Sequence, residues 1–432
     1  MKCSGVFKTA NYYQDLRDHV MRFYFAKDKD IQTLQDIKLQ QTVKQAQMDI
    51  DFYQKSFLKH GFDAREFKGL EQIKNVPILD PADYFSHTQA ERSRPGAVCI
   101  MRSSGTSGTP KNTYLSWVDF QRTRRISYLR MLFLNGFDPF YKNLFLTSAN
   151  SSYKIQPKWF WKFGLMQERI INATISLREQ ASVFDAYRPD VFNCLSSDGV
   201  LLADFIRTHT QIKHKAKYIF TTGEMPSDKN NKQILDTLGS KIIDFYASTE
   251  AGIIAWQCSK TQGYHINVDQ LYVEIIDGQR ICVEGQAGEV VLTTLDARCS
   301  PLIRYRTGDI AVLKKGKCQC GSSFPCLSQI QGRANDFLTA VNGQRVSPYL
   351  LMSTMDRIKE VKQYQIHQSG LAEYRFYIRP HATVFNQAFL YQKIKNEYTN
   401  ILGQQSNILV VPFEQRITSG DQIKRKVIIF NA

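Results

Sequence analysis

Hydrophobic and polar residues alternate along the chain with two different periods. Between residues 37 and 60, apolar side chains recur at steps of three and four, which predicts a helix with one apolar face. Residues 117–137 show the same period and end near Gly136, so they predict a second helix. Short apolar runs of strand length follow at 143–147, 190–195, 216–223 and 241–247.

Helix-length stretches such as residues 196–211 separate these runs. Strands that alternate with helices are typical of βαβ units and a mostly parallel sheet. From 264 to 313 the pattern changes to short strands with Gly and Asp between them, which indicates an antiparallel part. After residue 332 comes an α+β pattern with an Asn342-Gly343 pair, a strong hairpin signal.

These patterns predict an α/β protein of two domains, because a chain of 432 residues is too long for one compact core. The large N-terminal domain is expected over residues 1–332, with mainly parallel βαβ sheets and an antiparallel subdomain over about 264–331. A small, mobile α+β domain is expected over residues 333–432.

The composition narrows the class of protein. Hydrophobic residues make up 43% and charged residues 22%, which is ordinary for a soluble globular protein. No run approaches the roughly 18 apolar residues that a membrane-spanning helix needs. Residues 1–20 lack the apolar core of a secretory signal. We therefore expect no transmembrane segment and a cytoplasmic location.

The formal net charge is +16, from 56 Lys and Arg against 40 Asp and Glu. A basic protein attracts anions such as nucleotides, nucleic acids or an acidic carrier protein. The basic clusters come with no known nucleic-acid-binding motif, so no nucleic-acid partner is expected. These clusters lie at 92–94, 122–125, 213–217 and 424–426.

A loop rich in Gly, Ser and Thr connects the apolar pattern at 97–105 to the second predicted helix. Its residues are Ser103, Ser104, Gly105, Thr106, Ser107, Gly108, Thr109, Pro110 and Lys111. Glycine lets backbone N–H groups approach phosphate oxygens, hydroxyl groups add donors, and a lysine adds positive charge. The loop is not of the G-x-x-x-x-G-K-[ST] type, because Pro110 separates Thr109 from Lys111. It predicts phosphate binding, and the alternative is a flexible Ser/Gly loop.

Three later motifs follow this loop. They are Tyr246-Ala247-Ser248-Thr249-Glu250, Tyr305-Arg306-Thr307-Gly308-Asp309 and Gly332-Arg333-Ala334-Asn335-Asp336. The loop and the three motifs resemble, in order and over nearly the whole chain, the signatures of the superfamily of acyl-CoA synthetases, peptide-synthetase adenylation domains and luciferases. The resemblance implies an adenylate-forming enzyme with a hinge at Asn335.

The resemblance implies a role for each motif residue, and each role is physically reasonable. Tyr246 can stack on adenine, Asp309 can accept hydrogen bonds from ribose hydroxyls, and Glu250 can hold Mg²⁺. Thr249 is expected to bind the α-phosphate or the substrate carboxylate. The alternative for any one of them is a polar group at a strand end. The expected ATP- or AMP-binding residues are Ser103, Ser104, Gly105, Thr106, Ser107, Gly108, Thr109, Lys111, Gly223, Glu224, Tyr246, Ala247, Ser248, Asp309 and Arg333.

Within the superfamily, residues 39–63 and 258–277 resemble the phenylacetate–coenzyme A ligases, as does the Cys-x-Cys-Gly sequence at 318–321. The related capsular-polysaccharide biosynthesis proteins share these traits. The resemblance makes coenzyme A the first choice of acyl acceptor, with an acidic carrier protein or an amine acceptor as alternatives. The oligomeric state stays open, with a dimer as one option.

Three of the nine cysteines are crowded together, at Cys318, Cys320 and Cys326, and Cys258 and His265 come shortly before them. A Cys₃His set suits tetrahedral Zn²⁺, and a closed ligand sphere makes such a site structural. The resemblance implies a zinc-like site at matching positions. Its expected ligands are Cys258, His265, Cys318 and Cys320, with Cys326 in reserve. The alternative is a polar loop with free cysteines.

The chain departs from the superfamily pattern near its C-terminus, where a lysine is expected to stabilise the transition state of adenylation. The familiar Gly-Lys pair here reads Gly-Asp-Gln at 420–422. One alignment puts Gln422 at the lysine position, and a shift of two residues puts Lys424 there. We take Lys424, so the expected catalytic set is Lys424, Glu250 and Thr249.

A second departure is Asn335, where the hinge motif usually carries Asp. Asparagine still tolerates the unusual backbone angles of a hinge. Trp159 to Trp161 either line an aromatic acyl pocket or pack as core, and core is the better interpretation. The acid therefore stays open between aryl, fatty and amino acids.

The predicted reaction has two steps. The substrate carboxylate attacks the α-phosphorus of Mg·ATP to give acyl-AMP and pyrophosphate. The C-terminal domain then swings, and the thiol of coenzyme A takes the acyl group. One alternative is a ligase that acylates a protein or an amine. The other is a non-catalytic nucleotide-binding homologue, which the altered lysine segment suggests.

Overall fold

The computed structural model describes most of the chain. The described residues are 20–102, 111–147, 164, 167–225, 227–258, 260, 263–381, 386–415 and 428–430. At 102, 335, 415 and 428–430 the description is confined to the backbone.

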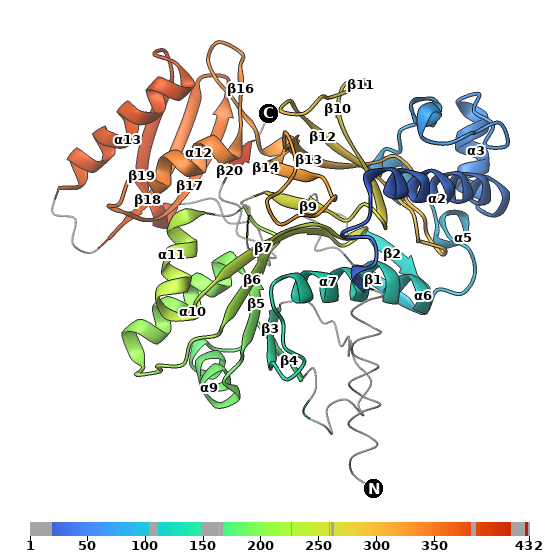
Figure 1. Ribbon diagram of the computed structural model, residues 1–432. Coiled ribbons are helices and arrows are strands. Elements are labelled where there is room, and N and C mark those ends of the chain that lie inside the picture. The colour runs from blue at the N-terminus through green and yellow to red at the C-terminus, as the bar shows by residue number, and fades with distance from the viewer. Residues whose placement is uncertain are drawn as a thin grey trace, which may run out of the picture.

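One sheet of twelve strands forms the centre of the molecule (Figure 1). Its spatial order is β11-β10-β12-β13-β14-β9-β8-β7-β6-β5-β3-β4. The strands are β3 (Asn143–Thr147), β4 (Glu168–Asn172), β5 (Val191–Leu195), β6 (Tyr218–Thr222), β7 (Ile242–Ser248), β8 (Gly252–Gln257), β9 (Tyr264–Ile266), β10 (Leu271–Asp277), β11 (Arg280–Ile281), β12 (Ala287–Thr294), β13 (Tyr305–Leu313) and β14 (Cys326–Arg333).

Strands β3 to β7 run parallel, whereas β8 to β14 pair antiparallel. The predicted strands at 143–147, 190–195, 216–223 and 241–247 coincide with β3, β5, β6 and β7 to within two residues at each end. The predicted antiparallel part continues the parallel sheet and does not form a sheet of its own. The change of direction falls between β7 and β8, which pair antiparallel.

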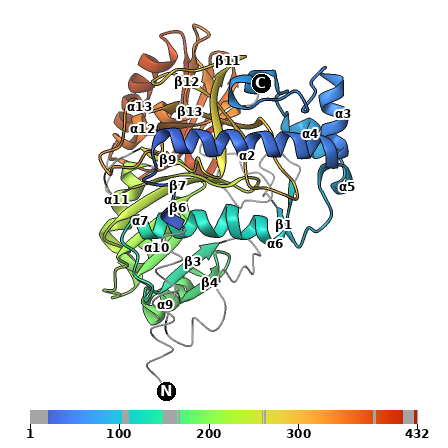
Figure 2. The ribbon, with the colours of Figure 1, turned by 45° about the vertical axis from the view of Figure 1, so that its right-hand side comes forward.

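Helices cover both faces of the parallel half (Figure 2). On one face, Leu129 and Leu132 of α7 (Ser127–Leu134) share a core with Phe220. On the other, α9 (Leu177–Tyr187) and α10 (Ser196–His209) share a core with Ile219. Neighbouring strand residues point to opposite faces, so Ile219 and Phe220 serve different cores. The remaining helices here are α6 (Trp117–Phe120), the π-helical turn η2 (Gln121–Ile126) and α11 (Asp228–Thr237).

The N-terminal helices pack against the antiparallel half through a third core, which joins Leu39 and Val43 to Leu271 and Leu292. The predicted helix at 37–60 is divided at Ile50, whose backbone is extended and whose side chain is buried. These elements are α2 (Asp28–Asp49), α3 (Asp51–Lys59), η1 (Leu70–Asn75), α4 (Pro81–Ser86), α5 (Gln89–Arg92) and the hairpin of β1 (Cys99–Arg102) and β2 (Asn112–Leu115). No helix among the described residues is long and apolar enough to cross a membrane.

A second, four-stranded sheet in the order β19-β18-β17-β20 has a separate core between residues 338 and 410. We call it, with its helices, the small unit. The Asn-Gly pair forms the predicted hairpin, with a φ of +81° at Gly343. The elements are η3 (Ala334–Asp336), β15 (Leu338–Thr339), β16 (Arg345–Val346), α12 (Pro348–Asp356), β17 (Val361–Gly370), β18 (Glu373–Pro380), α13 (Gln387–Leu402), β19 (Asn407–Pro412), η4 (Phe413–Gln415) and β20 (Ile428–Phe430).

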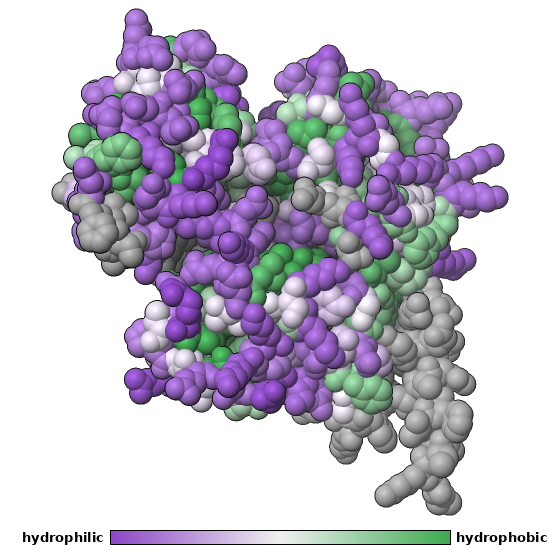
Figure 3. Space-filling view, turned by 60° about the vertical axis from the view of Figure 1, so that its left-hand side comes forward, coloured by the Kyte–Doolittle hydropathy of each residue, from purple (hydrophilic) through white to green (hydrophobic). Residues whose placement is uncertain are grey.

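Polar contacts join the small unit to the twelve-stranded part. The hydroxyl of Ser227 donates to Asp356 at 2.5 Å, and Lys362 pairs with Asp204 at 3.4 Å. Lys229 donates to the carbonyl oxygen at the start of β17. Figure 3 shows one face of the molecule. This face is mostly hydrophilic and is hollowed between its upper and lower parts.

Candidate functional site

The Tyr246–Glu250 motif ends strand β7 and turns back into β8. Ser248 closes β7 and pairs with Gly252 at the start of β8, so Thr249 and Glu250 lie in the turn between them. The hydroxyl of Ser248 accepts a hydrogen bond from the backbone N–H of Ala251 at 3.0 Å, which stabilises this turn. Gly252 has a φ of +86°, a conformation that glycine adopts without strain.

The Tyr305–Asp309 motif begins strand β13, next to β12 and β14. The hydroxyl of Thr307 donates to the carbonyl oxygen of Val290 in β12 at 2.9 Å and accepts from the N–H of Asp309 at 3.1 Å. Asp309 pairs in register with Arg333 of β14. The third predicted motif, at 332–336, therefore begins beside the second.

Lys111, Glu250 and Tyr305 form one group of contacts, brought together from the start of β2, which Lys111 directly precedes, from the β7–β8 turn and from β13. The Lys111 ammonium lies 3.8 Å from a carboxylate oxygen of Glu250 and 3.4 Å from the hydroxyl oxygen of Tyr305. Tyr305 donates to Glu250 at 3.4 Å. Burial, followed by the charge of Glu250, raises the pKa of Tyr305 well above its usual value, so this hydroxyl keeps its proton at neutral pH.

Tyr246, Asp309 and Arg333 form a second group beside the first. The Tyr246 hydroxyl donates to the Asp309 carboxylate at 2.6 Å, and Nε of Arg333 lies 3.8 Å from the other oxygen of that carboxylate. Burial, followed by the nearby carboxylate, raises the pKa of Tyr246 well above its usual value. The Arg333 side chain is 51% exposed, so the group reaches solvent on that side.

Gly223 and Glu224 follow strand β6, where the chain turns with a φ of +76° at Gly223. The Glu224 carboxylate accepts hydrogen bonds from the backbone N–H and the hydroxyl of Ser197, both at 2.7 Å. Ser197 is not among the residues predicted from the sequence. The available signal was a pair of serines directly after the strand at 190–195, since serine is common where helices begin.

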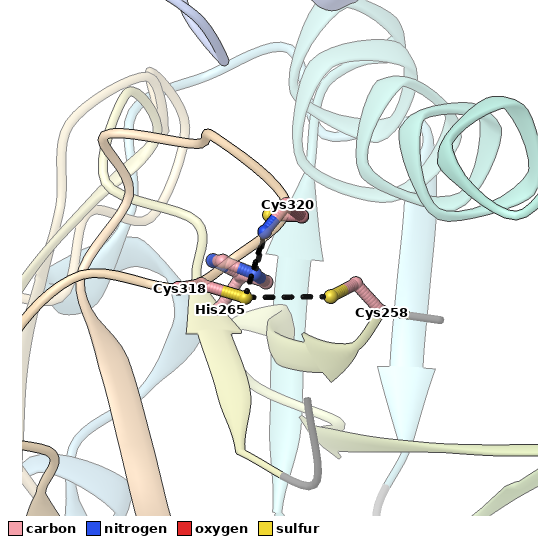
Figure 4. Close-up of side chains that lie close together, drawn as sticks. All are labelled: Cys258, His265, Cys318 and Cys320. Atoms are coloured by element: carbon pink, nitrogen blue, oxygen red, sulfur yellow. Dashed lines mark hydrogen bonds between the residues drawn. The ribbon is translucent and has the colours of Figure 1, made fainter. Parts of the chain in front are cut away.

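The predicted cysteine and histidine ligands lie together in the antiparallel half (Figure 4). Cys258 follows β8, His265 lies in β9, and Cys318 and Cys320 lie in the loop before β14. The four ligand atoms all lie within 4.8 Å of one another. The sulfurs of Cys258 and Cys318 are 3.7 Å apart, and the Cys320 sulfur is 3.4 Å from Nε2 of His265.

These spacings fit a tetrahedral zinc ion. Zinc–sulfur bonds of about 2.3 Å at tetrahedral angles place two sulfurs about 3.8 Å apart. Nδ1 of His265 faces the carbonyl oxygen of Phe324 at 3.1 Å, which leaves Nε2 turned toward Cys320. A carbonyl acceptor for the second ring nitrogen is the usual companion of a metal-bound histidine.

Cys326, the ligand held in reserve, lies on the other side of the histidine ring. Its sulfur is 3.3 Å from Nδ1 of His265 and is not in the group of four. Burial raises the pKa of the Cys326 thiol to about 12. Burial acts the same way on Cys318, but hydrogen bonds from Cys320 and Cys258 outweigh it and lower the pKa of that thiol. A lowered pKa favours the thiolate, which is the form that binds metals.

Several predicted site residues lie outside the described part of the chain. They are Ser103, Ser104, Gly105, Thr106, Ser107, Gly108, Thr109, Gln422, Lys424 and the aromatic segment from Trp159 to Trp161. Asn335 lies in the short helix η3, which directly follows β14 and begins the small unit. Ala247 pairs with Ile253 of β8.

Comparison with known proteins gives no matching family model. A phenylacetate-coenzyme A ligase of Thermus thermophilus is 26% identical to this chain over 352 residues, which is 78% of each protein. The structure of 2-hydroxyisobutyryl-CoA ligase in its postadenylation state, with 2-HIB-AMP bound, matches with a TM-score of 0.79 at 19% identity, over 95% of this chain and 91% of that one.

The same 2-hydroxyisobutyryl-CoA ligase with 2-HIB-AMP and CoA in its thioesterification state matches with a TM-score of 0.62, at 18% identity over 94% and 91% of the two chains. The fold of this chain thus matches the first of these two structures more closely than the second. The chain is a homologue of the phenylacetate–coenzyme A ligases and has the fold of the acyl-CoA ligases of the adenylate-forming superfamily.

Proposed function

We propose that this protein activates a carboxylic acid with ATP and transfers the acyl group to coenzyme A. The carboxylate attacks the α-phosphorus of ATP, pyrophosphate leaves, and the thiol then takes the acyl group from the acyl-adenylate with release of AMP. The observation that carries the proposal is the meeting of Lys111 with Glu250, and of Tyr246 with Asp309, at the junction of the parallel and antiparallel strands.

The chemistry of these side chains supports ATP as the substrate. The buried ring of Tyr246 offers a flat surface to adenine, and the Asp309 carboxylate offers two acceptors to the ribose hydroxyls. Glu250 would hold Mg²⁺, whose charge would offset that of the triphosphate. Lys111 already lies beside Glu250, so its ammonium is close to the place where the phosphates would lie.

The remaining predicted residues complete the proposed site. The loop at 103–109 would bind phosphate oxygens, and Thr249 would bind the α-phosphate or the acid. Gly223 and Glu224 would border the adenine. Lys424 would bring positive charge to the α-phosphorus in the transition state, where it is worth most.

We infer that residues 333–432 form a mobile domain that turns about Asn335 between the two half-reactions. The separate core of the small unit and its polar contacts with the rest of the chain support this inference. This chain also matches two states of 2-hydroxyisobutyryl-CoA ligase with different TM-scores, 0.79 and 0.62, which supports a movement between such states.

We further propose that Cys258, His265, Cys318 and Cys320 bind a structural zinc ion. Three soft sulfur ligands and one imidazole are typical of zinc. A site closed by four protein ligands leaves no position for a substrate, so its role would be to join β8, β9 and the loop before β14.

The first prediction concerns the reaction itself. In an assay of ATP–pyrophosphate exchange with a panel of aryl, fatty and amino acids, at least one class of acid should give exchange well above the rate without acid. Mass spectrometry of the products should then show an acyl-CoA when coenzyme A is present. An acylated amine or carrier protein would indicate the alternative acceptor. Absence of exchange with every acid, with equal ATP binding by wild type and Lys424→Ala, would indicate a non-catalytic nucleotide-binding protein.

The second prediction concerns the nucleotide. Replacing Asp309 by Asn should raise the KM for ATP by about 10- to 100-fold, because hydrogen bonds to a charged acceptor are lost. The KM for coenzyme A should change little. Asp277→Asn is a matched control, since this carboxylate is 72% exposed at the end of β10. Equal KM values for ATP in the two variants would contradict the role of Asp309.

A further inference from the structure

Arg124 lies in the π-helical turn η2. This turn connects α6 to α7, which Figure 2 shows end to end. A π-helical turn is wider and less regular than an α-helical one, and such turns often occur at functional sites. None of the sequence motifs includes this residue. Its side chain nevertheless reaches the β7–β8 turn, which carries Thr249 and Glu250.

The guanidinium of Arg124 binds two consecutive carbonyl groups of that turn. It donates to the carbonyl oxygen of Ser248 at 2.9 Å and, through its other terminal nitrogen, to the carbonyl oxygen of Thr249. In a trans peptide the N–H points opposite to the C=O. The N–H groups of Thr249 and Glu250 therefore face away from Arg124.

The close approach of the two segments depends on Gly252. A Cβ atom at this position would lie 2.7 Å from the carbonyl oxygen of Thr123 and 3.1 Å from a terminal nitrogen of Arg124. The φ of +86° at Gly252 also disfavours any larger residue. The helical turn and the β7–β8 turn thus lie in direct contact.

We propose that Arg124 is a positioning residue for the ATP half-reaction, an inference that rests on the function proposed above. By holding the carbonyl groups of Ser248 and Thr249, it fixes both peptide planes around Thr249. These planes determine where the side chains of Thr249 and Glu250 point. Glu250 is thereby directed to Tyr305 and Lys111, the place where the phosphates and Mg²⁺ are expected.

The test compares Arg124→Ala, Arg124→Lys and the control Arg122→Ala in ATP–pyrophosphate exchange at saturating ATP and acid. Arg122 lies in the same helical turn, is 42% exposed and pairs with Asp296 at 3.5 Å, away from the β7–β8 turn. The readouts are the exchange rate, the MgCl₂ concentration for half-maximal rate, and rescue by added guanidinium chloride at a concentration too low to unfold the protein.

In Arg124→Ala we expect the exchange rate to fall and the half-saturating MgCl₂ concentration to rise, each by about 10- to 100-fold, because groups that orient a metal ligand typically have this effect. Guanidinium should restore part of the rate. Arg124→Lys keeps the charge but cannot bind both carbonyl groups in the same plane, so it should show a smaller shift of the same kind. Arg122→Ala should stay within about twofold of wild type.

A purely structural role would lower the amount of folded protein without moving the MgCl₂ dependence. The inference is wrong if folded Arg124→Ala or Arg124→Lys keeps the MgCl₂ dependence of Arg122→Ala. If Arg124→Ala does not fold, the MgCl₂ dependence of the Arg124→Lys variant alone tests the inference. Failure of the proposed function looks different, because wild type itself would then show no exchange with any acid.

Discussion

Replacing Glu250 by Gln is expected to slow ATP–pyrophosphate exchange by at least about 100-fold. The substitution keeps the size of the side chain and an acceptor for the Tyr305 hydroxyl, but it removes the negative charge. The Glu250 side chain is only 10% exposed, so water does not easily replace the lost charge. Lys111 would lose its carboxylate partner at the same time.

The measurement is the exchange rate over a series of MgCl₂ concentrations. If Glu250 holds Mg²⁺, the half-saturating MgCl₂ concentration should rise together with the loss of rate. Glu397→Gln is a suitable control, because this residue is an exposed glutamate of α13 in the small unit. A Glu250→Gln protein that is folded and retains more than about half of the exchange rate would show that the carboxylate has another role.

Replacing Cys318 by Ser is expected to abolish stoichiometric zinc binding and to lower the midpoint of thermal unfolding by about 10 °C or more. The sulfurs of Cys258 and Cys318 come from segments 60 residues apart in the chain, so loss of a zinc ion bound between them would free two loops at once. Zinc content by elemental analysis and thermal unfolding with and without a chelator are the measurements.

Cys326→Ser is the matched control for the zinc site. Cys326 is equally buried and touches the same histidine, but from the Nδ1 side. This variant should keep about one equivalent of zinc. Wild-type protein with less than about 0.2 equivalents after gentle purification would end the zinc proposal, given the tight binding expected. Loss of zinc in Cys326→Ser would instead indicate a ligand set that contains Cys326 and Nδ1 of His265.

Much of the parallel half could be predicted because its strands are short apolar runs bounded by turns. The division of the first helix at Ile50 could not, since the apolar period continues across it and Ile50 itself is buried. The continuity of the antiparallel strands with the parallel sheet was also beyond prediction. It depends on pairing between β7 and β8 and between β9 and β14, and the second pair is distant in the chain.

The candidate site, like the fold, could be predicted only in part from the sequence. Motif residues such as Tyr246 and Asp309 were predicted because each lies in a recognisable local sequence. The structure adds the hydrogen bond between them, across 63 positions of the chain. Arg124 carries no such signal, because it binds backbone carbonyl groups, and any sequence supplies those. Residues that act on the main chain of a distant turn become visible only once the fold is known.

The polar character of the contacts between the small unit and the twelve-stranded part bears on how the protein behaves in concentrated solution. If the small unit turned as proposed, so that Ser227 separated from Asp356 and Lys362 from Asp204, the groups uncovered there would be a hydroxyl, an ammonium and carboxylates, which water solvates readily. An apolar junction would expose hydrophobic surface, which promotes association between molecules, each time it opened. A domain that opened once per turnover could therefore do so many times without drawing neighbouring molecules into aggregates.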